Sequence, residues 1–238
     1  MPKVNLSDLR YAIRYPRQAI RYLRHRDRIS YETCAKYLPR APVIVEAGAY
    51  DGSNTREFCR FWPGCQVYAF EPVPSACERM LKVADEFPDR IHPQQMALGS
   101  VTTAAEMHIS VTGADGGEQS SSLLAPAATH EEFPFVDFRD GTIPVRVTRL
   151  DEWAAENGVR SVDFLWLDLQ GMELAALEGC GDLLSKVAAI HCEVQNVPLY
   201  NGAPLYPQIS RWLKQHRFCV AQEAVFRRGG NVLFVRQK

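Results

Sequence analysis

The chain has 238 residues, of which 46% are hydrophobic and 23% are charged, a globular composition that suits one domain with an appendage. No apolar run reaches the roughly 18 residues that cross a bilayer, and the N-terminus lacks a signal peptide's apolar centre, so we expect a cytoplasmic protein. The seven cysteines show neither a CxxC pair nor the Cys/His spacing of a zinc site, and we expect them to be reduced and mostly buried.

Residues 1–40 form a basic N-terminal extension, with ten Lys and Arg against three Asp and Glu, whereas the rest of the chain is acidic. Leu6, Leu9 and Ile13 fall near helical spacing, which predicts a helical segment that Pro16 breaks or kinks. Such a charge run is usually a solvated helical face, but basic amphipathic stretches also contact an anionic substrate, a carrier or a membrane surface. Nucleic acid is a weaker candidate, because the acidic remainder has no nucleic-acid-binding motif.

From residue 41 to 238, short apolar runs alternate with helical stretches, which predicts βαβ units and a mostly parallel sheet with helices on both faces. Two further apolar runs flank RRGG and predict a terminal antiparallel hairpin. The stretch 99–148 is too long for an ordinary connection, so we expect an insertion over the site. The predicted strands span 42–47, 66–71, 90–98, 162–168 and 187–194, and the predicted helices span 54–62, 74–86, 149–157, 172–185 and 205–216.

The segment VIVEAGAYDGSNT, residues 43–55, reads as a strand, a glycine turn and the start of a helix. Gly48 would let a ligand approach the backbone, and the helix N-terminus offers free N–H groups. The pattern is not GxGxxG, and Glu46 and Asp51 beside the turn would repel the phosphates of a dinucleotide. This turn therefore favours a cationic ligand.

The segment VYAFEP ends the next predicted strand with Glu71. A carboxylate at this position can accept hydrogen bonds from both hydroxyls of a ribose, each worth roughly 1.5 to 3 kcal/mol. A nucleoside without phosphates and with a positive centre describes S-adenosylmethionine better than NAD.

Carboxylates also end the strands at 162–168 and 187–194. Ligands of open α/β sheets bind beyond such strand ends, which would bring Asp168, Glu193 and Gln195 to one rim. The two carboxylates could orient a hydroxyl, take its proton or, with Asn196, hold a divalent ion such as Mg²⁺, although no spacing is diagnostic of a metal. Asp168 could instead cap the helix that follows it.

Five segments in this order resemble the FkbM-type S-adenosylmethionine-dependent methyltransferases. VEAGAYDGSNT is similar to the family's first motif, VYAFEPVP to its V-x-A-F-E-P-x-P, and MALGS and QSSSL to its A-L-G/S and Ser-Ser-Leu segments. VDFLWLDLQGMELAALEGC is similar to its V-D-F-[IL]-K-I-D-V-E-G segment. The resemblance covers about four-fifths of the chain. It implies a seven-stranded Rossmann-like methyltransferase fold, residues 41–238 as the catalytic domain, and usually O-methylation of a sugar, a polyketide or another natural product.

The resemblance also implies roles for individual residues. By the resemblance, Asp168 would face the reaction centre. Its place at the same rim makes Glu193 a second catalytic candidate, and the insertion at 99–148 would contribute to the acceptor pocket. We expect the following residues to bind the donor: Glu46, Gly48, Ala49, Tyr50, Gly52, Asn54, Thr55, Glu71, Pro72, Ala97 and Asp168. We expect Ser121, Ser122, Gln170 and Gln195 to bind the acceptor.

Three positions depart from the family pattern. Tyr50 stands where Asn is common, and Trp166 and Gln170 replace the usual Lys and Glu around Asp168. The sequence therefore predicts an O-methyltransferase that uses S-adenosylmethionine and acts on a carbohydrate or natural product. An N-methyltransferase of a small amine and a non-catalytic scaffold that binds S-adenosylmethionine are the alternatives, and a homo-oligomer is compatible with each.

Overall fold

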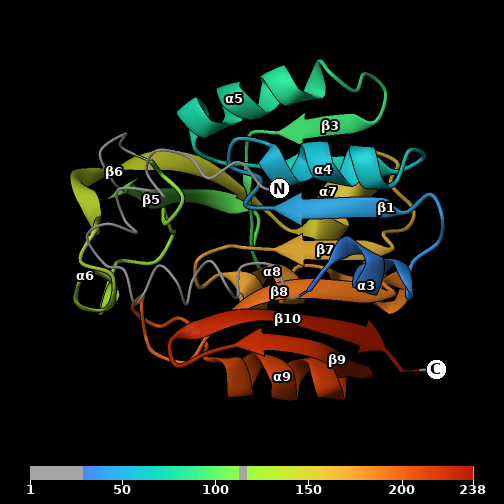
Figure 1. The fold of residues 1–238 in the computed structure, drawn as a ribbon. Helices are drawn as coiled ribbons and strands as arrows, with labels where there is room; N and C mark the ends of the chain where they lie inside the picture. Colours follow the sequence, from blue (N-terminus) through green and yellow to red (C-terminus); the bar gives the residue numbers. More distant parts are fainter. Residues whose placement is uncertain (1–28, 113–116, 238) are drawn as a thin grey trace.

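A computed structural model describes residues 29–112 and 117–237 and contains a seven-stranded sheet (Figure 1). Its strand order is β3-β2-β1-β7-β8-β10-β9. The first five strands in this order are parallel, and β10 pairs antiparallel with both β8 and β9. The mostly parallel sheet and the C-terminal hairpin confirm the predicted Rossmann-like methyltransferase fold. The strands are β1 (Val43–Ala47), β2 (Gln66–Phe70), β3 (Ile91–Gln94), β7 (Phe164–Leu167), β8 (Ala189–Gln195), β9 (Phe218–Val225) and β10 (Gly229–Arg236).

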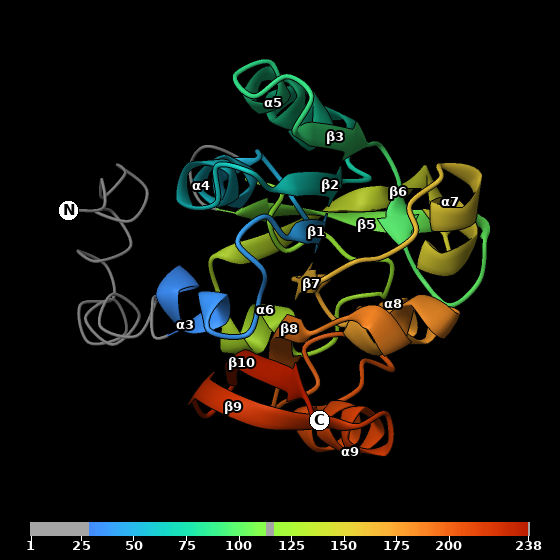
Figure 2. The same ribbon diagram turned by 90° about the vertical axis from the view of Figure 1, so that its right-hand side faces the viewer.

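Helices cover both faces of this sheet, as Figure 2 shows end-on. On one face, α3 (Tyr31–Ala35), α4 (Ser53–Phe61) and α5 (Pro74–Ala84) pack their apolar sides onto the sheet. On the other face lie α7 (Leu150–Glu156), α8 (Glu173–Glu178) and α9 (Tyr206–Gln215). Because the central strands are buried on both faces, their sequences are continuously apolar until they reach the strand ends.

The insertion forms a second sheet beside the carboxyl ends of the parallel strands (Figure 1). The strands β5 (Thr103–Thr112) and β6 (Val136–Thr148) pair antiparallel, and β4 (Ala97–Leu98) pairs parallel with β6. The short helix α6 (Thr129–Glu132) lies in the connection between β5 and β6. An apolar cluster joins this sheet to α5, with Met107, Ile109 and Val145 against Val73 and Ala76.

Two predicted elements are each divided in the structure. The run predicted as one strand over 90–98 turns where the Met96 N–H bonds to the Gln94 carbonyl, so its last two residues leave the main sheet as β4. The helix predicted over 172–185 stops after Glu178 and resumes as the 3₁₀ segment η1 (Gly181–Lys186). Gly181 has φ 49°, a left-handed conformation that interrupts an α-helix.

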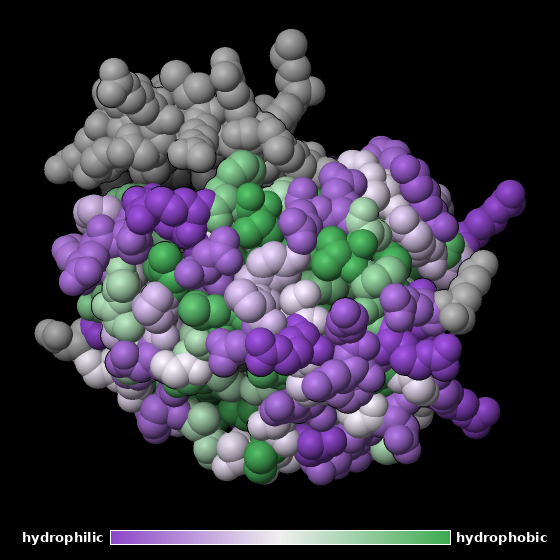
Figure 3. Space-filling model, turned by 90° about the horizontal axis from the view of Figure 1, so that it is seen from below, coloured by the Kyte–Doolittle hydropathy of each residue, from purple (hydrophilic) through white to green (hydrophobic). Residues whose placement is uncertain are grey.

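The predicted basic extension lies outside the described residues except for residues 29–40. There, Ser30 caps α3 through a bond from the Thr33 N–H. Within the described ranges, no helix is long and apolar enough to cross a membrane. The edge formed by α9 and β9 is mostly hydrophilic, with separate apolar residues (Figure 3). The free cysteines are buried except for the half-buried Cys219, as predicted.

Candidate functional site

The loop after β1 lies against the ends of β2 and β7. The N–H groups of Gly48 and Ala49 both donate to the Phe70 carbonyl at 3.0 Å, and the Asp168 N–H donates to the Ala47 carbonyl at 3.0 Å. Gly48 has φ 84°, and a Cβ there would lie 1.9 Å from the Asp168 carbonyl oxygen. The main chain of Asp168 therefore requires glycine at position 48. This close approach brings together two predicted motifs, the segment 43–55 and the strand end at Asp168.

Glu46 on β1 is fully buried. Thr55 on α4 donates a hydrogen bond to Oε2 of Glu46, whereas Oε1 has no partner. Burial raises the pKa of Glu46 to about 8; the Thr55 bond opposes this rise, and the charges of Asp51 and Asp168 add to it. A buried carboxylate oxygen without a donor is costly. A cationic group with N–H donors would satisfy it, so Glu46 fits such a ligand.

Glu71 follows β2 and is also buried. Its Oε2 accepts the Tyr50 N–H and its Oε1 accepts the Val73 N–H, both at 2.8 Å. Burial raises the pKa of Glu71 to about 7, while the two backbone bonds and the charge of Arg79 oppose the rise. Each carboxylate oxygen retains a lone pair, so both can accept a further hydrogen bond.

The other predicted donor residues lie on the elements that follow these strands. Gly52 has φ 77° and precedes α4, and a Cβ there would lie 3.0 Å from Val83 of α5. Asn54 is half-buried in the first turn of α4, Pro72 is buried directly after Glu71, and Ala97 is buried at the start of β4.

Asp168 and Glu193 meet at the ends of β7 and β8 through the amide of Gln170. The Gln170 Nε2 donates to Asp168 Oδ1 and to Glu193 Oε2, both at 2.7 Å, and its Oε1 lies 2.9 Å from the Tyr200 hydroxyl. Gln170 has φ 51° and Gly171 has φ 101°, so a left-handed turn presents this amide to both carboxylates. The two predicted catalytic carboxylates are thus brought together.

Three acidic side chains lie close together at this rim, those of Asp168, Glu173 and Glu193. Burial raises the pKa of Glu193 well above its usual value, and the neighbouring charges of Asp168 and Glu173 raise it further, against the opposing bond from Gln170. Glu173 accepts the N–H groups of Leu169 and Gly171, and burial raises its pKa to about 7. Glu173 therefore serves the turn before α8, while Asp168 stays exposed at the rim.

The residues predicted to bind the acceptor lie around the same rim. The Ser122 hydroxyl donates to the Gln170 carbonyl at 2.8 Å, and the Ser121 hydroxyl donates to the Glu118 carbonyl at 2.7 Å. Gln195 is buried on β8, two residues beyond Glu193, and its Oε1 has no partner. The insertion thus touches the rim directly through Ser122.

Asn196 is directed elsewhere, because its Nδ2 donates to the Phe226 carbonyl in the C-terminal hairpin. In the part of the chain that the structure describes, no group of three or more His, Cys, Asp or Glu side chains is arranged to hold a metal ion.

His191 and Trp166 stack on the α3 face of the sheet, with ring centroids 3.5 Å apart and planes 2° apart. Trp166 also contacts Tyr31, Phe58 and Phe164, so it packs within the aromatic cluster of this face. Burial lowers the pKa of His191 to about 3 and leaves its Nδ1 without a partner.

Sequence reasoning missed two residues with several contacts in this region. Tyr200 places its hydroxyl 2.8 Å from the Ser120 carbonyl besides contacting Gln170, and Glu118 is a buried carboxylate of the insertion. Neither residue lies in a spacing that marks a site. Only the proximity of Glu118 to the QSSSL segment pointed toward it.

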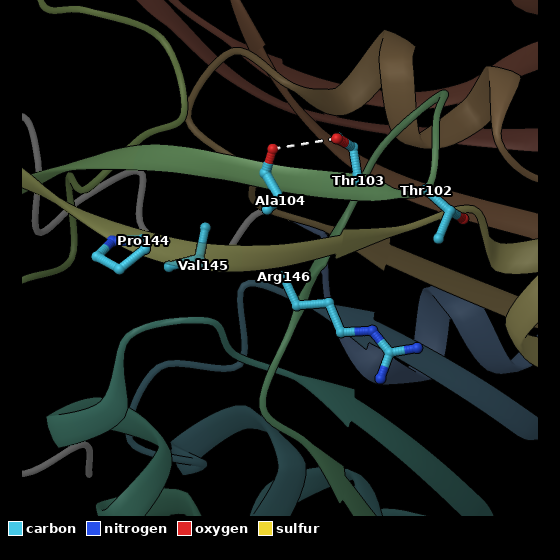
Figure 4. Close-up of a pocket in the computed structure, with 6 residues that line it drawn as sticks. All are labelled: Thr102, Thr103, Ala104, Pro144, Val145 and Arg146. Carbon is cyan, nitrogen blue, oxygen red and sulfur yellow. Dashed lines mark hydrogen bonds between the residues drawn. The ribbon is translucent and has the colours of Figure 1, made fainter.

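Two surface hollows lie outside the carboxylate cluster. One of about 300 Å³ lies on the three-stranded sheet and is lined by the six residues drawn in Figure 4, among them Thr102 and Arg146. The other, of about 280 Å³, lies between Leu124 of the insertion, Met172 and Pro204. Gly171 lines this second hollow and follows Gln170 directly, so the hollow adjoins the rim.

The model of the methyltransferase FkbM domain matches residues 46–220 of the chain, which include both sets of carboxylates. The chain belongs to this FkbM methyltransferase family. The match begins at Glu46 and extends into β9, so it covers the loop after β1, the insertion and the rim at the ends of β7 and β8. The predicted family is therefore confirmed.

A curated relative in this family is the 2-O-methyltransferase NoeI of Sinorhizobium fredii (strain NBRC 101917 / NGR234). It is 34% identical over 163 residues, which are 68% of this chain and 66% of NoeI, so the chain spans just under two thirds of that relative's length. Among solved structures, an rRNA methylase from Streptococcus thermophilus is similar at 12% identity and a TM-score of 0.46, covering 86% of this chain and 92% of that one. A Streptococcus agalactiae protein of the NADB-Rossmann superfamily is similar at 14% identity and a TM-score of 0.47, covering 88% of this chain and 69% of that one.

Proposed function

We propose that the protein is an S-adenosylmethionine-dependent O-methyltransferase that acts on a hydroxyl of a carbohydrate or another natural product. The observation that carries the proposal is the contact between the Gly48 loop and Asp168, which brings the buried acids Glu46 and Glu71 next to the Asp168–Glu193 rim. The relative's activity as a 2-O-methyltransferase supports an oxygen acceptor.

The buried acids suit the donor. Bound S-adenosylmethionine supplies a methyl carbon that a sulfonium ion makes electrophilic. We expect Glu71 to accept hydrogen bonds from the ribose hydroxyls with its remaining lone pairs, and Glu46 to accept from the positively charged part of the donor. Gly48, Ala49 and Tyr50 would line the same loop.

The rim suits the acceptor. We expect Asp168 and Glu193 to orient the hydroxyl and to take its proton while the carbon–oxygen bond forms and the carbon–sulfur bond breaks. Burial raises the pKa of Glu193, so it holds a proton more tightly than an ordinary glutamate, and we expect it to orient the hydroxyl while the exposed Asp168 takes the proton. Gln195 has a free oxygen for an acceptor hydroxyl, while Ser121, Ser122 and Gln170 bond within the protein and would shape the pocket. Positioning supplies about 7 to 11 kcal/mol in such reactions.

The donor assignment is tested by calorimetry with S-adenosylhomocysteine on the wild type and on Glu71→Gln. A lost charge-assisted bond of roughly 1.5 to 3 kcal/mol predicts an affinity at least about tenfold lower. Glu132→Gln is the matched control, because Glu132 lies in the insertion and pairs with Arg227 and Arg228 instead. Equal affinity in Glu71→Gln and the wild type would overturn the donor site.

The catalytic assignment is tested with Asp168→Asn and a panel of carbohydrate hydroxyl and amine acceptors. We expect this variant to transfer methyl roughly 10² to 10⁴ times more slowly, since a base is lost, and this loss should exceed any loss of affinity for S-adenosylhomocysteine. Unreduced transfer to a hydroxyl acceptor would remove Asp168 from the mechanism. Transfer by the wild type to amines alone would replace O-methylation with N-methylation, and donor binding without any transfer would favour a scaffold.

A further inference from the structure

Glu118 is a buried carboxylate of the insertion that is linked through Arg79 of α5 to the loop after β1, residues 48–52, which is the proposed donor loop. Its side chain is 6% exposed and accepts hydrogen bonds from Ser75 at 2.6 Å, Arg139 at 3.0 Å and Arg79 at 3.3 Å. Ser75 and Arg79 belong to α5, whereas Arg139 belongs to β6. One carboxylate of the insertion therefore ties two separate elements together.

The position of Glu118 is fixed by its own loop. The Ser121 N–H and hydroxyl both donate to the Glu118 carbonyl, and the Ser121 oxygen in turn accepts the Ser110 N–H at 3.0 Å. Ser110 lies on β5 and is fully buried. The carboxylate thus projects from a loop that is bonded to the second sheet.

Arg79 connects this carboxylate to Tyr50. The Arg79 guanidinium lies 4.9 Å from the centre of the Tyr50 ring, within the range of a cation–π contact. The same ring packs against the apolar cluster of Met107, Ile109 and Val145. Tyr50 is therefore held between an arginine of α5 and the apolar face of the insertion.

Tyr50 needs such support because its backbone has φ 49°, a left-handed conformation that is unfavourable for a tyrosine. In this conformation its N–H donates to Oε2 of Glu71 at 2.8 Å. Arg79 also acts on Glu71 directly, since its charge lowers the pKa of that carboxyl while Glu118 raises it. The network from Glu118 thus ends at a proposed donor ligand.

We propose that Glu118 and Arg79 form a latch through which the insertion holds Tyr50, and with it the donor loop, in the conformation that binds S-adenosylmethionine. The proposal rests on the donor site proposed above. Glu118 and Arg79 are positioning residues here, because they act on the donor through Tyr50 and Glu71.

The test compares Glu118→Gln with Glu132→Gln. Both glutamates belong to the insertion and pair with two arginines, but of the two it is Glu118 whose partner, Arg79, contacts Tyr50 of the donor loop. We expect Glu118→Gln to lower the affinity for S-adenosylhomocysteine about fivefold or more and to speed hydrogen exchange of the Tyr50 amide. We expect Glu132→Gln to leave both quantities near the wild-type values.

A double variant tests the route. Asn tolerates a left-handed backbone, so Tyr50→Asn removes the ring without adding strain. If the latch acts through this ring, Glu118→Gln will have little further effect on affinity in the Tyr50→Asn background. An undiminished effect in that background, or an effect no larger than that of Glu132→Gln, would overturn the latch.

Arg79→Met covers the case in which Glu118→Gln unfolds, because it leaves Glu118 bonded to Ser75 and Arg139. The same fivefold loss and faster exchange are expected, and wild-type values for both would refute the proposal. The Glu71→Gln result distinguishes a failure of the latch proposal from a failure of the donor-site proposal. If Glu71→Gln weakens S-adenosylhomocysteine binding and the latch variants do not, only the latch proposal is wrong. If Glu71→Gln has no effect on this binding, both the donor-site assignment and the latch proposal are wrong.

Discussion

Glu46 illustrates at the scale of one residue how a proposed binding group lowers stability. Its pKa of about 8 in the folded chain lies above the ordinary 4.5, so folding favours its neutral form. The stability that this shift contributes is present below about pH 4.5 and is lost as the pH rises through 8. The unpartnered Oε1 adds to the cost of the charged form.

Glu46→Gln should therefore raise the free energy of unfolding at pH 9, by on the order of 2 kcal/mol, and change it little at pH 5. The same variant should weaken S-adenosylhomocysteine binding, because the amide carries no charge for the donor. Urea denaturation at the two pH values and calorimetry check both parts. A stability loss at pH 9 would show that the charged form is well accommodated without ligand.

At the scale of elements, the close approach of β1 and β7 sets the site. Gly48→Ala should destabilise the protein by about 3 to 5 kcal/mol, because it combines a left-handed backbone with a Cβ 1.9 Å from the Asp168 carbonyl. Gly158→Ala is the control, since Gly158 has φ 69° but nothing within 4 Å of its Cβ position. It should cost only about 1 to 2 kcal/mol. Similar losses in chemical denaturation would mean that the β1 loop can move away from Asp168.

Among the elements, some strand positions could be predicted from the sequence and others could not. The strands around Glu46, Glu71 and Asp168 were predictable because continuous apolar runs, buried on both faces, end abruptly at charged residues. The end of the strand between Gln94 and Met96 was not predictable from the sequence. It depends on the pairing of β4 with β6, which lies about fifty residues later in the chain. Likewise, the amide of Gln170 joins Asp168 to Glu193 through a left-handed turn that no residue spacing reveals.

At the scale of the whole molecule, buried acids govern the response to pH. Glu71 and Glu173 have pKa values of about 7 and Glu46 of about 8, so all three bind protons more tightly when folded. His191, with a pKa of about 3, has the opposite effect, but only below its ordinary 6.5. As the pH rises above 6.5, the effect of His191 on stability fades, whereas the raised pKa values of the acids still lower the free energy of unfolding.

The free energy of unfolding of the wild type should therefore fall steadily between pH 6.5 and 8.5. Urea denaturation across this range measures the slope, and Glu46→Gln should make it shallower. A free energy of unfolding that stays constant over this range would mean that the pKa values of these acids are not raised in the folded chain.

The close approach of Gly48 to the Asp168 carbonyl bears on how the proposed site could be redesigned. Main-chain bonds between neighbouring strands set the spacing between the proposed donor acids and the proposed acceptor acids, so side-chain replacement elsewhere leaves that spacing intact. The second sheet lies outside these bonds, and the insertion contacts the rim through Ser122, which donates to the Gln170 carbonyl, and through the Ser120 carbonyl, which accepts from Tyr200. Insertions exchanged between relatives, with Glu118 retained, should thus behave as interchangeable modules that change which hydroxyl is presented while the transfer geometry stays constant.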